Sequence, residues 1–219
     1  MENHINNEKV IDFINEIYVN NNISSEFDEL RQYAEENKVP IIHREVGEFL
    51  KTILVMNPPK HILEIGTAIG FSSIFFAKNT PENTQITTLE LNEEVIPLAK
   101  ENIAKFGYEN RINVIQGNAL DIIPHLENKY DFIFIDAAKG QYLNFFEEIE
   151  PKLTESAIIV SDNILFKGMV ADDQLLVRRK KTIVQRLRKY LNLLTTKDGY
   201  TSSILPLGDG VCLTIKEER

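Results

Sequence analysis

The most informative motif in the sequence is HILEIGTAIG at residues 61–70. Its apolar first half predicts a strand over 61–65, and the residues that follow predict a helix over 71–79. Glycine in the turn between them lets a ligand approach the backbone, and the start of a helix offers free N–H groups. The spacing is Gly66-x-x-x-Gly70 rather than the G-x-G-x-x-G of dinucleotide-binding enzymes, so an NAD-dependent oxidoreductase is disfavoured.

Short apolar runs continue to alternate with longer amphipathic runs after this motif. The runs predict five strands, at 61–65, 85–90, 111–116, 130–136 and 157–162. Helices are predicted at 71–79, 93–106, 119–126 and 140–152. The segments FIFI and IIV are continuously apolar, as expected for strands that are buried on both faces. Five strands joined by helical crossovers predict a parallel sheet with helices on both sides.

The two ends of the chain complete an α/β fold class. A helix is predicted at about 174–194, and strands at 200–207 and 210–215 flank the turn residues Gly208 and Asp209, which predicts an antiparallel C-terminal hairpin. Residues 6–56 predict an N-terminal helical cover that is interrupted at Pro40. We therefore expect a mostly parallel seven-stranded sheet. A length of 219 residues favours one domain over 1–219, with N-terminal helices in 1–56 and the core in 60–216.

Composition excludes several classes of protein. Hydrophobic residues make up 43% and charged residues 26%, which is ordinary for a globular chain. The net charge of −9 excludes a uniformly basic nucleic-acid binder but allows a local basic patch. Cys212 is the single cysteine, so an internal disulfide and a multi-cysteine zinc site are excluded. The sequence has no long apolar run and no signal-peptide pattern at its acidic start, which predicts a cytoplasmic protein with no membrane partner.

Acidic and amide side chains follow the predicted strands. Glu90 ends the second strand, where an acid can accept both ribose hydroxyls of an adenosine. Asp136 ends the fourth strand, and Asp162 and Asn163 end the fifth, which together suit a hard cation such as Mg²⁺. Lys139, three residues after Asp136, could act as a general base or orient the nucleophile. The alternatives are solvated acids, acids that cap helices, and an exposed loop lysine.

The pattern E-x-G-T-x-x-G with a later strand-end acid resembles the Rossmann-like, class I S-adenosylmethionine-dependent methyltransferases over about residues 40–216. The resemblance implies that Gly66 and its neighbours approach the methionine part of S-adenosylmethionine and that Glu90 binds the ribose. It also implies that Asn118 and Ala119 flank the adenine, although many members have Asp at the position of Asn118. The full implied cofactor-binding set is Ile42, Glu64, Gly66, Gly70, Ser72, Ser73, Glu90, Gly117, Asn118, Ala119 and Asp136.

The segments FIDAAKGQY and VSDN narrow the resemblance to the cation-dependent O-methyltransferases, which include the catechol and caffeoyl-coenzyme-A enzymes. This resemblance implies that Asp136, Asp162 and Asn163 bind Mg²⁺ or Mn²⁺ and that Lys139 and Asp136 are catalytic. It also suggests a homodimer. A nucleotide-binding module without catalysis remains an alternative, but such a module would need neither the metal nor the lysine.

The segment RRKKTIVQRLRKY at 178–190 is strongly basic, with seven basic residues among the twelve at 178–189 and no acid. It is either a solvated helix face or a patch that follows nucleic-acid phosphates, through Arg178, Arg179, Lys180 and Lys181. Together with VPIIHREVGEFL at 39–50, it resembles the bacterial tRNA 5-hydroxyuridine methyltransferases. That resemblance implies a tRNA anticodon loop as partner and O-methylation of the wobble 5-hydroxyuridine to 5-methoxyuridine. The alternative acceptor is a small catechol-type phenol.

Overall fold

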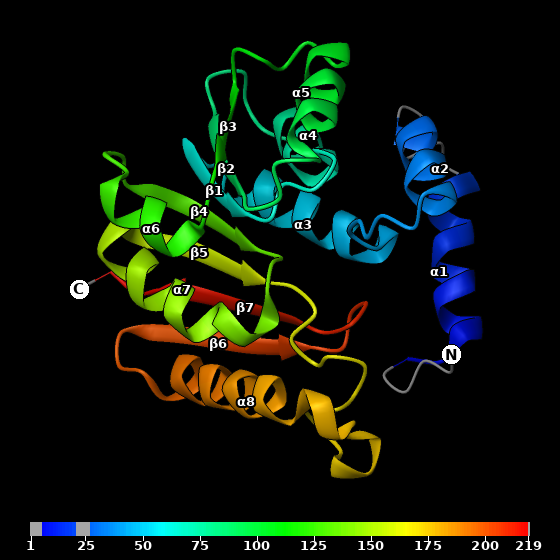
Figure 1. The fold of residues 1–219 in the computed structure, drawn as a ribbon, viewed down its shortest axis with the longest axis vertical. Helices are drawn as coiled ribbons and strands as arrows, with labels where there is room; N and C mark the ends of the chain where they lie inside the picture. The colour runs from blue at the N-terminus through cyan, green and yellow to red at the C-terminus, as the bar shows by residue number, and fades with distance from the viewer. Residues whose placement is uncertain (1–5, 21–26, 219) are drawn as a thin grey trace.

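A computed structural model describes residues 6–20 and 27–218 and shows a twisted seven-stranded sheet in the order β3-β2-β1-β4-β5-β7-β6 (Figure 1). The strands β1 to β5 are parallel where they pair, and β7 is antiparallel to both β5 and β6. The strands are β1 (His61–Ile65), β2 (Gln85–Glu90), β3 (Ile112–Gln116), β4 (Tyr130–Ile135), β5 (Leu153–Ser161), β6 (Tyr200–Leu205) and β7 (Val211–Lys216). The predicted mostly parallel sheet with a C-terminal antiparallel hairpin is therefore confirmed.

Helices cover both faces of this sheet. They are α1 (Glu8–Asn20), α2 (Asp28–Glu36), α3 (Arg44–Met56), α4 (Phe71–Lys78), α5 (Ile96–Lys105), α6 (Ala119–Ile122), α7 (Tyr142–Ile149) and α8 (Lys181–Thr196). The helices α6, α7 and α8 share one buried apolar cluster, and α2 to α5 share the other. Figure 1 shows α1 and α2 in blue at the edge of the molecule, beyond α3. None of the described helices is long and apolar enough to span a membrane.

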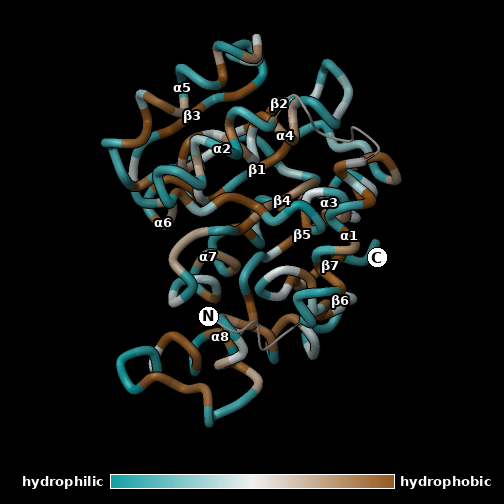
Figure 2. The backbone as a smooth tube through the Cα atoms, turned by 90° about the vertical axis from the view of Figure 1, so that its right-hand side faces the viewer, coloured by the Kyte–Doolittle hydropathy of each residue, from teal (hydrophilic) through white to brown (hydrophobic). Residues whose placement is uncertain are grey.

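The alternation of side chains along the central strands explains the two clusters. On β4, Ile133 and Ile135 face the cluster of α6 to α8, whereas Phe132 and Phe134 face the other cluster. Phe76 of α4 meets both phenylalanine rings edge to face, at centroid distances of 5.8 and 5.2 Å. Figure 2 shows the hydrophobic segments along the strands in the middle of the molecule. Burial on both faces is what the continuously apolar strand sequences predicted.

Two predicted element boundaries are wrong. The helix predicted at about 174–194 begins only at Lys181, after two short 3₁₀ turns at Asp173–Leu175 and Arg178–Lys180. The buried face of α8 starts at Val184, so nothing apolar holds the preceding residues to a continuous helix. The fifth strand begins at Leu153 rather than at 157, because it pairs with β4 on both sides of an irregularity in register.

The hairpin buries the single cysteine of the chain. Cys212 lies on β7 opposite Ser161 of β5 and has no exposed surface. Burial raises the pKa of its thiol. Cys212 is therefore a core residue.

Candidate functional site

The carboxyl ends of four strands lie side by side and bring the predicted site residues together. The parallel hydrogen-bond ladder runs past the strand ends: Gly66 N–H donates to Leu89 at 3.0 Å, and Asp136 N–H donates to Ile65 at 3.0 Å. Asp162 N–H likewise donates to the carbonyl of Ile135 at 2.9 Å. The strand order reverses between β1 and β4, so Gly66 and Asp136 flank the point where parallel α/β sheets bind ligands.

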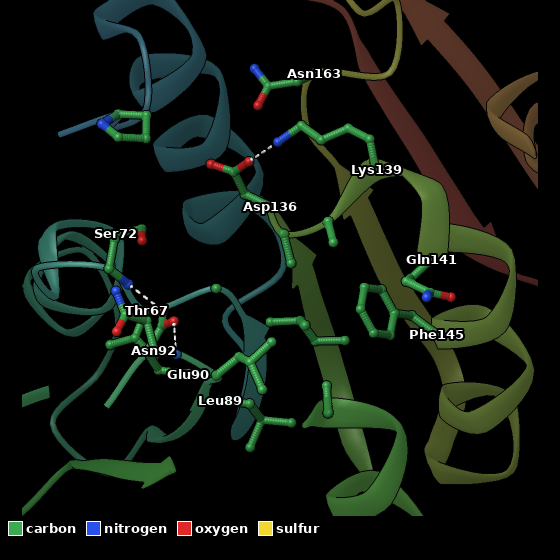
Figure 3. Close-up of a pocket in the computed structure, with 18 of the residues that line it drawn as sticks. Thr67, Ser72, Leu89, Glu90, Asn92, Asp136, Lys139, Gln141, Phe145 and Asn163 are labelled. Carbon is green, nitrogen blue, oxygen red and sulfur yellow. Dashed lines mark hydrogen bonds and ion pairs between the residues drawn. The ribbon is translucent and has the colours of Figure 1, made fainter. Parts of the chain in front are cut away.

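A cavity of about 680 Å³ opens at this point, a size typical of pockets for cofactors and small molecules. Most of the predicted site residues line it, with the carboxylate of Glu90 toward one end and Asp136, Lys139 and Asn163 together toward the other (Figure 3). The predicted residues in the lining are Ile42, Gly66, Ser72, Glu90, Gly117, Asn118, Ala119, Asp136, Lys139 and Asn163. The cavity is therefore long, with one acidic binding point at each end.

Three predicted cofactor residues, Glu64, Gly70 and Ser73, do not line the cavity. Ser73 of α4 donates a hydrogen bond to the Glu64 carboxylate beneath the glycine turn. Gly70 begins α4 with φ +82°, and a Cβ there would lie 3.3 Å from the carbonyl oxygen of Ala99 on α5. These residues support the turn from behind, which the spacing of the motif alone does not distinguish from lining the cavity.

Glu64 is a fully buried carboxyl group. Its burial raises its pKa to about 7, although hydrogen bonds from Ser72, Ser73 and Thr88 oppose the shift. Its Oε1 atom has no hydrogen-bond partner among the described residues. A buried carboxyl group therefore lies directly below the glycine turn that faces the cavity.

Gly66 stands where only glycine fits. Its φ is +109°, and an added Cβ would overlap the carbonyl oxygen of Asp136. We expect Gly66→Ala to lower the free energy of unfolding by about 3 kcal/mol or more, from backbone strain plus steric overlap, as measured by urea denaturation. Gly107→Ala is the control, since Gly107 also has positive φ, +74°, but no heavy atom lies within 4 Å of an added Cβ. Equal losses in the two variants would contradict the steric argument.

Glu90 joins two of the loops that border the cavity. Its Oε2 accepts the Ala68 N–H at 2.9 Å, and its Oε1 accepts the Asn92 N–H at 2.8 Å. Each carboxylate oxygen keeps a further acceptor site, so Glu90 can also accept a vicinal diol such as that of a ribose. Asn118 caps α6 by accepting the Leu120 N–H, at 3.2 Å. Its side chain therefore orders the start of a helix at the cavity wall.

The sequence-based prediction missed several residues of the cavity wall. Thr67 and Ala68 lie inside the glycine turn and could have been inferred from the motif itself. Gln141 and Phe145 come from the start of α7 and lie on the same side of that helix, four residues apart. A polar residue and an aromatic residue with that spacing carry no signal that separates a cavity wall from ordinary helix packing.

Asp136, Asp162, Asn163 and Lys139 form an oxygen-rich cluster at the other end of the cavity. Lys139 Nζ lies 2.7 Å from Oδ1 of Asp136. Asp162 is only 1% exposed and does not line the cavity, but its carboxylate is close enough to Asp136 for their charges to interact. Burial first, and then the charge of Asp136, raise the pKa of Asp162 to about 7. Asn163 adopts φ +55°, a left-handed conformation that asparagine tolerates better than most residues.

This cluster fits a divalent cation. It offers two carboxylates and one amide oxygen, the donor types that Mg²⁺ and Mn²⁺ prefer. Only Asp136 of the two carboxylates bonds the Lys139 ammonium, and a bound cation would balance the charge of both. Within residues 6–20 and 27–218, no group of three or more His, Cys, Asp and Glu side chains could hold a metal ion, and this cluster reaches three donors only through the amide of Asn163.

The four basic residues Arg178, Arg179, Lys180 and Lys181, hereafter the basic turn, lie at the start of α8. Three of them are exposed, and Lys180 lies over the ring of Phe166 at 5.6 Å. The first turns of α8 pack on the segment Lys139–Gln141: Arg186 donates to the carbonyl of Gly140 at 3.1 Å. The contacts of α8 with the segment that carries Lys139 come from Ile183 and Arg186, which follow the basic turn in the sequence.

Comparison with known proteins agrees with this geometry. The family model described as O-methyltransferase matches residues 18–217. The chain belongs to the O-methyltransferase family. Among curated O-methyltransferases, the catechol O-methyltransferase of Niastella koreensis is 30% identical over 178 residues, which cover 77% of this chain and 79% of that enzyme. A caffeoyl-CoA O-methyltransferase of Medicago sativa is 31% identical over 183 residues, covering 78% of this chain and 73% of that enzyme.

Solved structures of other O-methyltransferases share the fold. One from Staphylococcus aureus, provisionally named a caffeoyl-CoA O-methyltransferase, is 37% identical with a TM-score of 0.88, covering 95% of this chain and all of that one. An O-methyltransferase from Bacillus cereus, solved in complex with SAH, is 25% identical with a TM-score of 0.82, covering 94% of this chain and 100% of that one. The predicted relationship to the catechol and caffeoyl-coenzyme-A enzymes is therefore confirmed.

Proposed function

We propose that this O-methyltransferase transfers the methyl group of S-adenosylmethionine to the 5-hydroxyl of wobble 5-hydroxyuridine in tRNA, giving 5-methoxyuridine. The observation that carries the choice of tRNA is the basic turn, which is mostly exposed in a chain of net charge −9 and precedes the helix α8 that contacts the Lys139 segment. A local concentration of positive charge beside a site is what a polyanionic substrate requires. A tRNA acceptor also implies that the enzyme works in the cytoplasm.

The cavity has the shape and polarity to hold S-adenosylmethionine. In this proposal Glu90 accepts the ribose hydroxyls, Asn118 and Ala119 border the adenine, and Gly66 lets the methionine part approach the backbone. The SAH complex of the Bacillus cereus relative supports this assignment. The methyl group would then point toward the Asp136 end of the cavity, where the acceptor must enter.

Asp136, Asp162 and Asn163 would hold Mg²⁺ or Mn²⁺. When bound, the ion supplies a Lewis acid that favours the oxyanion form of the acceptor hydroxyl. Lys139 keeps its ammonium group on Oδ1 of Asp136, which fixes that carboxylate and places positive charge beside the acceptor oxygen. The acceptor hydroxyl would release its proton to solvent, and the site would hold the resulting oxyanion facing the sulfonium, so that the O–CH₃ bond forms as the S–CH₃ bond breaks and S-adenosylhomocysteine leaves. The O5 and O4 atoms of 5-hydroxyuridine form an adjacent oxygen pair like that of a catechol.

Nucleoside mass spectrometry tests this proposal. The protein is incubated with S-adenosylmethionine, Mg²⁺ and tRNA that contains 5-hydroxyuridine, with and without EDTA, and a catechol is tested in parallel. We expect 5-methoxyuridine that disappears with EDTA. Methylated catechol without any tRNA product would move the function to the second candidate, a small catechol-type phenol. That candidate is favoured by the name of the Niastella koreensis relative.

We also propose that the enzyme is a homodimer that pairs through α1. Val10 and Phe13 on this helix are 53% and 61% exposed, an unusual exposure for apolar side chains on one helix face. We expect light scattering to give the mass of two chains for the wild type and of one chain for Phe13→Glu, because a buried carboxylate would disfavour the interface. Ile204→Glu on β6, another exposed apolar position, is the control and should stay dimeric. A monomeric wild type would contradict the proposal.

A further inference from the structure

Tyr142, the first residue of α7, places its hydroxyl between the two predicted metal-binding strand ends. The side chain is 1% exposed. Its hydroxyl donates to the carbonyl oxygen of Asp162 at 2.9 Å and also lies 3.2 Å from the carbonyl oxygen of Ile135. One phenol group thus contacts the backbone directly before Asp136 and the backbone of Asp162.

These bonds lie where the sheet no longer holds the strands together. The last ladder bond between the two strands joins Asp162 N–H to the carbonyl of Ile135. Beyond it, the buried Asp162 and the partly exposed Asp136 must stay close although their carboxylates carry like charge. A bond from a third element to both strand ends opposes their separation.

The ring of Tyr142 is itself fixed. It meets the ring of Tyr190 edge to face at 5.7 Å and 85°, and the Tyr190 hydroxyl bonds to Oγ of Ser161 at 2.6 Å. Burial also raises the pKa of Tyr142 well above its usual value, so the phenol keeps the proton that it donates. The hydroxyl therefore has one position, defined by packing rather than by solvent.

We infer that Tyr142 is a positioning residue that sets the spacing of Asp136 and Asp162 for a divalent cation, through hydrogen bonds to the backbone of both strand ends. This inference rests on the proposed metal site. Of the two carboxylates, only that of Asp136 forms a direct hydrogen bond with the Lys139 ammonium. Lys139 therefore cannot set the distance between Asp136 and Asp162. Groups that orient metal ligands in this way typically change metal affinity by 10- to 100-fold when they are removed.

Direct titration with Mn²⁺, followed by the electron paramagnetic resonance signal of the free ion, tests the inference without tRNA or S-adenosylmethionine. We expect Tyr142→Phe to raise the Kd for Mn²⁺ about tenfold. Tyr130→Phe is the matched control, because it removes the hydroxyl of another tyrosine that is 1% exposed, at the start of β4 and away from the predicted metal-binding strand ends. It should leave the Kd within about twofold. Methyl transfer by Tyr142→Phe should recover when Mn²⁺ is raised about tenfold, which general loosening of the fold would not allow.

The possible outcomes separate the inference from the proposed function. If wild-type protein binds no Mn²⁺, the metal site itself is wrong. If wild type binds Mn²⁺ and the two variants bind it equally well, the positioning role of Tyr142 is wrong while the metal site stands. If Tyr142→Phe does not fold, the wild type gives the answer by NMR with ¹³Cζ-labelled tyrosine. The Tyr142 signal should then shift more than the Tyr130 signal on addition of Mg²⁺, and an unmoved Tyr142 signal would overturn the inference.

Discussion

Asp136→Asn is expected to lower kcat/KM for methyl transfer about a thousandfold or more. Asp136 lines the cavity, holds the Lys139 ammonium at 2.7 Å, and is one of two carboxylates in the proposed metal site. The change would remove one negative charge from that site and weaken the hold on Lys139 at the same time. A thousandfold loss corresponds to about 4 kcal/mol of transition-state stabilisation, within the range of metal electrostatics. Steady-state kinetics with S-adenosylmethionine and 5-hydroxyuridine-containing tRNA measures it.

Asp131→Asn is the control for this prediction because Asp131 lies on the same strand, β4, at its opposite end. Its carboxylate accepts the N–H groups of Lys60 and His61 at 2.8 and 2.9 Å and so contributes to the fold. We expect the control to lose stability but to keep kcat/KM within about threefold. An Asp136→Asn enzyme that keeps more than a tenth of wild-type activity, and that EDTA does not affect, would exclude the proposed metal step.

Changing all four residues of the basic turn to glutamine is expected to weaken tRNA binding roughly a hundredfold at moderate salt. Each lost phosphate contact should also reduce the slope of log K against log salt by about 0.7 to 0.9, so the total reduction should be about 3. Fluorescence anisotropy with labelled tRNA at several salt concentrations measures both quantities. Methylation of a small catechol, if it occurs, should remain within about twofold, since the basic turn lies outside the lining of the cavity.

The control for the basic turn is a variant with the same change in charge elsewhere. Lys60, Lys100, Lys105 and Lys129 are exposed lysines on other elements, and four changes to glutamine there remove the same number of positive charges. We expect this variant to lose less than about threefold in tRNA affinity. Similar losses in both variants would mean that net charge, and not a defined tRNA surface, controls binding.

Much of the fold follows from the sequence because the strands are buried on both faces. In β4, Phe132 and Phe134 lie on one side and Ile133 and Ile135 on the other, so no polar residue interrupts the apolar run of these four positions. The start of α8 was harder to predict, because basic residues are compatible with a helix as well as with a 3₁₀ turn. Hydrophobic periodicity defines the end of a helix or strand only where apolar residues extend to that end.

The sequence predicts mainly those residues of the site that lie at or just after the ends of strands. Parallel strands end at one edge of the sheet, so Glu90 and Asp136 had to border the same site on either side of Gly66. The sequence could not separate Gly66, which faces the cavity, from Gly70, which packs on α5, because the difference depends on a contact between distant elements. For the same reason the sequence does not predict the contacts of the Tyr142 hydroxyl with Ile135 and Asp162.

Because Cys212 is buried, the rate at which its thiol reacts with a reagent in solution reports local opening of the sheet. The thiol has no exposed surface and lies opposite Ser161, one residue before Asp162. A thiol reagent in solution can therefore reach it only when the hairpin separates from β5 or when the whole domain unfolds. Because this is the one cysteine in the chain, the labelling rate reports a single event at a known position. A ligand that holds the ends of β4 and β5 together should slow this labelling reaction. The decrease in labelling rate then measures how strongly a ligand bound at the site suppresses local opening of the sheet.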